Sequence, residues 1–192
     1  MHALVTRTAR LLALFGGVVL TFLIVMTALS VVGRTLNTIG YNAFIVANLS
    51  PVSAFLQNFG PINGDFEMVE AGMAVAIVAF LPWCTMIRGH ATVDIFTAGL
   101  PGRVNRFIDL LWEIVMAVVL TVIAWRLFVG TADKMRYGET TFLLQFPIWW
   151  GYAVCAVLAT VAAMVSLWIV AVRFAEWRGR PGVPITSARV DH

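Results

Sequence analysis

Residues 67–94, which read EMVEAGMAVAIVAFLPWCTMIRGHATVD, decide the fold class. Acids at Glu67 and Glu70 come first, a charge-free run from Ala71 to Ile87 follows, and Arg88 ends it. A helix rises about 1.5 Å per residue, so this run, with the turn before it, is long enough to cross a bilayer. Because Lys and Arg favour the cytoplasmic side, the span is expected to enter from outside and to leave inside.

The composition is that of an integral membrane protein, since 60% of the 192 residues are apolar and only 12% are charged. Four segments come close to the roughly 20 residues that cross a bilayer: Leu11–Val32, Phe66–Ile87, Phe107–Trp125 and Pro147–Val172. The sequence therefore predicts an all-α membrane protein with four transmembrane helices, in a single membrane domain over residues 1–192. The connection 34–65 is half apolar and leaves no room for a soluble catalytic domain.

The basic residues predict how the chain is oriented. With both termini in the cytoplasm, nine arginines lie inside: Arg7, Arg10, Arg88, Arg103, Arg106, Arg173, Arg178, Arg180 and Arg189. Four basic residues then lie outside: Arg34, Arg126, Lys134 and Arg136. This asymmetry predicts cytoplasmic termini, and it accounts for the positive net charge without a nucleic-acid partner. The first segment is expected to be an uncleaved signal-anchor, because its apolar run exceeds that of a signal peptide.

Short interfacial helices are expected in the connecting loops. Residues 50–60 carry a serine cap, a proline at the first helical position and a glycine stop. Their apolar residues share one face: Val52, Phe55, Leu56 and Phe59. Such a face suits the outer membrane interface or a partner protein. A second amphipathic turn is expected within residues 92–106, which Pro101 and Gly102 interrupt.

The fourth predicted span opens with residues suited to a membrane boundary. Pro147 fits a first helical position, and Trp149 and Trp150 fit the membrane–water interface. Small residues then recur every four positions: Gly151, Cys155, Ala159 and Ala163. Such a stripe lets another helix approach closely, either within this bundle or from a partner subunit.

Glu113 is the acid that lies deepest in a predicted span, with Arg106 and Asp109 spaced near the same helical face. Two roles remain open for it, pairing with an arginine near the cytoplasmic boundary or pairing with another subunit. Glu67 and Glu70 are expected at the outer interface, where carboxylates favour the positive amino end of a helix.

The sequence offers no pattern that an enzyme needs. It lacks a glycine-rich phosphate loop, a nucleophile with its base, and a cluster of metal ligands. His90 has no second histidine nearby for a haem or zinc site, and Cys84 and Cys155 are expected at opposite membrane faces. The spans also lack the polar groups or broken helices of a self-sufficient carrier. We therefore expect a scaffold, an anchor or an accessory subunit that binds no cofactor.

Several short motifs recur in the order known from one family: Gly64-Asp65-Phe66-Glu67, Phe80-Leu81-Pro82-Trp83, Arg88-Gly89-His90 with Val93-Asp94, Gly138-Glu139-Thr140-Thr141, and Pro147-Ile148-Trp149-Trp150-Gly151-Tyr152. With the four-span plan, they resemble the small integral membrane subunit, called Q, of the tripartite ATP-independent periplasmic (TRAP) transporters. The resemblance implies a bacterial inner-membrane transporter that takes up organic acids. We expect Arg88, His90 and Asp94 to fix the helix end at the inner boundary and to contact a partner rather than to touch substrate.

The same resemblance implies two protein partners and a division of labour. A large multi-span membrane (M) subunit, similar to an elevator carrier driven by a sodium gradient, would move the substrate. A periplasmic binding (P) protein would deliver it, and this chain would brace the large subunit's scaffold within the lipid. Two alternatives remain, the membrane anchor of a respiratory or redox complex and a stand-alone four-helix transporter.

Overall fold

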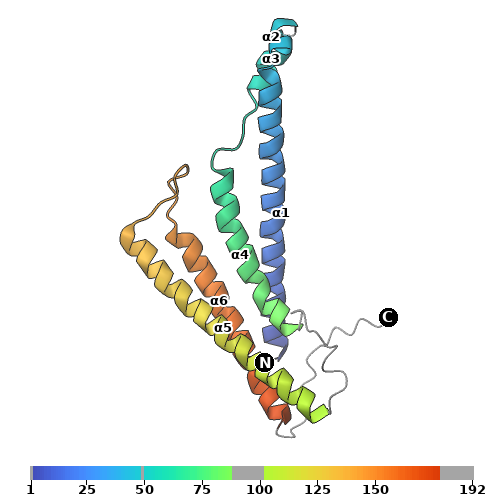
Figure 1. The fold of residues 1–192 in the computed structure, drawn as a ribbon, viewed down its shortest axis with the longest axis vertical. Coiled ribbons are helices and arrows are strands. Elements are labelled where there is room, and N and C mark those ends of the chain that lie inside the picture. The colour runs from blue at the N-terminus through green and yellow to red at the C-terminus, as the bar shows by residue number, and fades with distance from the viewer. Residues whose placement is uncertain (1, 49, 88–101, 178–192) are drawn as a thin grey trace, which may run out of the picture.

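The computed structural model describes residues 2–48, 50–87 and 102–177, and within them the chain forms six helices (Figure 1). These are α1 (His2–Gly40), α2 (Ala43–Asn48), α3 (Ser50–Gln57), α4 (Asp65–Met86), α5 (Gly102–Tyr137) and α6 (Trp149–Trp177). Among the described residues, α1, α4, α5 and α6 are long and apolar enough to cross a membrane. The prediction of an all-α protein with four spans is confirmed.

Two of the long helices continue well past the apolar runs that predicted them. α1 continues beyond Val32 to Gly40, and α5 continues beyond Trp125 to Tyr137. The 39 residues of α1 correspond to about 58 Å, nearly twice the thickness of a hydrocarbon core. Polar residues do not end a helix by themselves, because their side chains can bond within it. Thr35, for example, donates its hydroxyl to the carbonyl of Val31 at 2.9 Å.

The long helices form two antiparallel pairs, α1 with α4 and α5 with α6, and α4 also packs on α6. Figure 1 shows the two pairs meeting where α1 begins and α6 ends, and spreading apart toward the turn between α5 and α6. Buried apolar residues of α1, α4 and α6 form the core at the meeting point: Ala9, Met86, Val165 and Ile169. A second cluster joins α5 to α6 through Leu120, Ala162 and Ala163.

Small residues bring α1 and α4 close together. A Cβ placed on Gly16 would lie 3.2 Å from both the carbonyl oxygen of Ala76 and the Cβ of Ala79. Both alanines are fully buried. Helices in lipid associate by this kind of close packing, because lipid tails supply no hydrophobic drive between them.

The helix expected within residues 50–60 is α3, and it packs on the end of α1 (Figure 1). The carbonyl of Gly40 accepts the Ser53 hydroxyl at 2.9 Å and the Gln57 side-chain amide at 3.1 Å, which satisfies a free carbonyl at the carboxyl end of α1. The helix ends at Gln57, so Phe59 lies outside it, although its ring still meets that of Phe55 edge to face.

Candidate functional site

The start of α4 is tied to the turn between α5 and α6 by one carboxylate. Glu67, in the first turn of α4, accepts the backbone N–H groups of Leu143 and Leu144 at 2.6 and 3.0 Å. Hydrogen bonds to an ionised acceptor are among the stronger ones in proteins. Glu67 therefore connects the two helix pairs at the end where their axes diverge.

Gly64 completes this junction just before α4. It adopts a left-handed conformation with φ 77°, and the side chain of Leu144 occupies the space where a Cβ would lie. Any side chain at position 64 would strain the backbone and displace Leu144. The bond at Glu67 and the contact at Gly64 both hold the same turn.

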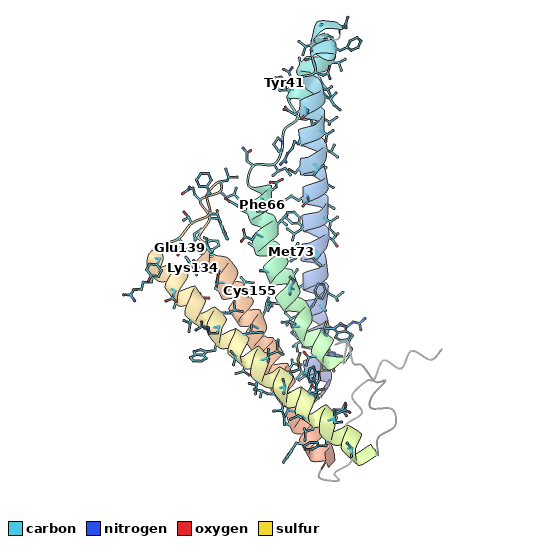
Figure 2. The ribbon with its side chains drawn as sticks, viewed as in Figure 1. Tyr41, Phe66, Met73, Lys134, Glu139 and Cys155 are labelled. Atoms are coloured by element: carbon cyan, nitrogen blue, oxygen red, sulfur yellow. The ribbon has the colours of Figure 1, made fainter. Side chains whose placement is uncertain are left out.

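The turn itself, residues 138–148, is held by its own hydrogen bonds. Thr140 and Pro147 form an isolated antiparallel bridge, and Thr141 donates its N–H to the carbonyl of Phe146 at 2.9 Å. An ion pair between Lys134 and Glu139, with Nζ and Oε2 2.5 Å apart, ties the end of α5 to the turn. Figure 2 labels both residues at this end of α5. The prediction that Pro147 opens the fourth helix is wrong, because α6 begins at Trp149. Pro147 has no N–H to donate, and its place in the bridge needs none.

Aromatic rings gather where α6 begins. Trp150 meets both Phe146 and Trp149 edge to face, with ring centroids 5.3 and 5.9 Å apart. One turn further, the ring of Tyr152 lies against Gly130 of α5, 3.1 Å from where a Cβ would stand. We call these rings the aromatic belt, because tryptophan and tyrosine typically gather at a membrane boundary, where the sequence predicts the start of this span.

The small-residue stripe of α6 faces the interior of the bundle. Ala159 is fully buried, and Cys155 and Ala163 are nearly so. Gly151 faces α4: a Cβ added to Gly151 would lie 3.9 Å from the Cβ of Ala71. Of the two roles left open by the sequence, the geometry matches packing within this chain.

A second polar contact joins α1 to α4, and sequence reasoning missed it. The Ser30 hydroxyl, fully buried on α1, donates to the carboxylate of Asp65 at 2.5 Å. It also accepts the N–H of Ile62 at 3.3 Å. Arg34 lies 4.0 Å from the same carboxylate. The pairing depends on helix registration, which spacing along the chain does not encode.

The predicted site residues do not converge on one point. Five of them lie near the α4 junction: Glu67, Pro147, Trp149, Trp150 and Gly151. Glu113 lies far along α5 from that junction and is buried, with 9% of its surface exposed. Glu70 is exposed, and the described residues offer it no hydrogen bond or ion pair.

Four further predicted residues cannot be placed in the site. Arg88, His90 and Asp94 lie outside the described residues. The side chain of Arg106 does so as well, although its backbone belongs to α5. Cys84 and Cys155 are free thiols.

The polar side chains of this junction bind backbone and side chains of the same chain. Within the described residues, no group of three His, Cys, Asp or Glu side chains is placed to hold a metal ion. The fold and the junction define a helical membrane protein with four spans, in which polar contacts join helix to helix.

Comparison with known protein families then identifies the kind of membrane protein. Residues 52–177, more than half of the chain, match the DctQ component of the tripartite ATP-independent periplasmic transporters. The chain belongs to this family, and the resemblance predicted from its motifs is confirmed. The matched range begins in α3 and ends with α6, so α1 lies before it. No curated protein and no solved structure matches the chain.

Proposed function

We propose that this small TRAP transporter subunit braces the stationary scaffold of a large membrane subunit, which carries the substrate by an elevator motion. The transported compounds are organic acids, delivered by a periplasmic binding protein and driven by a sodium gradient. The complex lies in the bacterial inner membrane, with both termini of this chain in the cytoplasm. The family match carries the proposal, since a tripartite transporter needs a membrane component beside its carrier and its binding protein.

Four threonine hydroxyls within the spans support a bracing role. Thr21, Thr27, Thr121 and Thr160 each donate to the carbonyl four residues earlier in their own helix, at 2.7 to 2.8 Å. A substrate path at mid-membrane needs polar groups directed away from the helix backbone. These four side chains are instead committed to their own helices, which fits a subunit that supports a carrier.

The length and joining of the helices support the same role. α1 and α5 are both longer than a hydrocarbon core requires, and the two helix pairs are fastened at both ends. At one end, the apolar core around Ile169 joins the two pairs. At the other end, Glu67 of α4 binds the turn between α5 and α6. Fixed contacts at two separated points resist relative rotation of the pairs, which is what a brace must do.

Reconstitution tests this proposal. The proteins encoded beside this chain are purified, and the probe is the dicarboxylate or sugar acid that most raises the melting temperature of the binding protein. Vesicles then receive this chain alone, the large subunit alone, or both, with the binding protein and a sodium gradient outside. We expect uptake only when both membrane subunits are present.

Two results would contradict the proposal in different ways. Uptake by vesicles holding only this chain would show that it is itself a carrier. Uptake by the large subunit alone at the full rate would show that the brace is dispensable. A binding protein that responds to no carboxylate would overturn the assigned substrate class.

A further inference from the structure

Arg126 is a positively charged residue on the face of α5 that the other described helices do not cover. Its side chain is exposed, and within the described part of the chain it makes no hydrogen bond or ion pair. The buried residues of α5 lie on the opposite side of the helix, at Leu110, Glu113, Ala117, Leu120 and Ala124. At 100° per residue, Arg126 lies about 160° around α5 from the middle of this buried face, so it is turned away from the buried residues.

The position of Arg126 along α5 places it inside the span. The sequence puts Arg126 at the end of the third span, but Gly130, one turn further, lies level with the ring of Tyr152 in the aromatic belt. Arg126 is thus about 6 Å deeper than that belt. The uncharged run between Glu113 and Arg126, residues 114–125, covers only about 18 Å, and a hydrocarbon core is about 30 Å thick. α5 cannot cross a membrane without taking one of these charges into it.

The residues around Arg126 form a seam suited to another helix. They recur at alternating steps of four and three along α5, and we call them the outer stripe: Ile108, Trp112, Val115, Val119, Val122, Arg126 and Val129. Trp112 and Val122 are 54% and 48% exposed. A repeat of 3.5 residues keeps one face of a helix against a partner helix, and the branched side chains of valine have few rotamers to lose there.

The charge on the stripe restricts what can cover it. Lipid tails suit the valines but not a guanidinium, and charges within spans normally pair with a partner. A second copy of this chain would insert with the same orientation and bring Arg126 against Arg126, which repel each other. A soluble binding protein cannot reach a residue one turn inside the belt. A partner span with an acid at matching depth meets every condition.

We propose that the outer stripe of α5 docks a transmembrane helix of the large membrane subunit, and that Arg126 pairs with a carboxylate on that helix. The inference rests on the proposed function, from which it takes the partner. An arginine suits this role because its fork of N–H donors matches a carboxylate and its charge persists at any physiological pH.

The test uses the intact complex, co-expressed with a tag on this chain and extracted into detergent. Arg126→Leu is the informative variant, because leucine is favourable in lipid but would leave the partner's carboxylate unpaired. We expect the large subunit recovered per tagged chain to fall roughly three- to fifteenfold, the range for polar pairs between membrane helices. Arg126→Lys should retain most of it. Arg136→Leu, an exposed arginine in the last turn of α5, serves as the matched control and should retain all of it.

The outcomes separate this inference from the proposed function. If the unaltered chain does not co-purify with the large subunit, the proposed function fails. If it does, and Arg126→Leu recovers as much large subunit as Arg136→Leu, the inference is overturned, because Arg126 then reaches lipid phosphate at the boundary. An equal loss in both leucine variants would overturn it too.

Photo-cross-linking provides a second readout that does not depend on affinity. A benzophenone amino acid at Val122, in the outer stripe, should cross-link to the large subunit. The same probe at Thr121, which is exposed at the same depth but points about 100° away, should cross-link much less. Equal cross-linking at the two positions, or none at Val122, would contradict a docking seam on this face.

Discussion

Two adjacent glycines of α1 offer a sharp test of the packing between α1 and α4. A Cβ at Gly16 would lie 3.2 Å from the carbonyl oxygen of Ala76 and 3.2 Å from the Cβ of Ala79, whereas one at Gly17 would meet nothing within 4 Å. These two nearest atoms belong to or adjoin the α4 backbone, which cannot turn aside as a flexible side chain could; Cε2 of Phe80 follows at 3.4 Å. Gly16→Leu and Gly17→Leu therefore differ in packing but share every local property of the helix.

The expected magnitudes follow from two opposing effects. Replacing glycine by leucine within a helix gains about 1 kcal/mol in both variants, because the unfolded chain loses freedom. Overpacking a tight interface costs roughly 1 to 3 kcal/mol, and only Gly16→Leu incurs it. We expect Gly17→Leu to be about 1 kcal/mol more stable than the unaltered chain, and Gly16→Leu to be less stable than Gly17→Leu by about 1 to 3 kcal/mol.

The assay is the unfolding free energy in mixed micelles, measured by titration with a denaturing detergent and followed by circular dichroism. The two variants are compared at the same micelle composition, so that their common effect on helix propensity cancels. Equal stability of the two variants, or a more stable Gly16→Leu, would refute the close contact of α1 with α4.

Two further substitutions test the junction and the interior of α6. Glu67→Gln should speed amide exchange at residues 143–144, because the amide nitrogen of glutamine cannot accept a second N–H; mass spectrometry measures this, and equal protection in Glu67→Gln and the control Glu70→Gln would contradict the tie. Ala159→Leu should lower the unfolding free energy by roughly 1 to 3 kcal/mol, because Ala159 is fully buried, whereas Val157→Leu at an exposed position should be nearly neutral. Similar effects of these two leucines would show that α6 does not bury this face.

The number and type of the spans could be predicted because long apolar runs have few stable structures in lipid. The ends of the helices could not be predicted, because a helix continues through polar residues whose side chains find hydrogen-bond partners within it. Thr35 of α1 is an example. The same limit affected α5: Arg126 reads as the end of a span in the sequence, but the helix continues to Tyr137, and the ring of Tyr152 packs on Gly130 one turn beyond Arg126.

The junction was only partly predictable for a different reason. The sequence indicated that Glu67 lies at the start of a span, but its carboxylate binds backbone N–H groups 76 and 77 residues away, which have no signature in residue types. The bond of Ser30 to Asp65 likewise depends on how α1 and α4 are registered. Contacts to the backbone and contacts between distant helices become visible only once the helices are placed.

The central claim is that this chain works as one subunit of a larger membrane complex, and its stoichiometry tests that most directly. Native mass spectrometry of the complex extracted through a tag on this chain should give a mass equal to one copy of this chain and one large multi-span protein, with or without the binding protein. A mass matching this chain alone or its homo-oligomers, from membranes that also contain the large protein, would contradict the account.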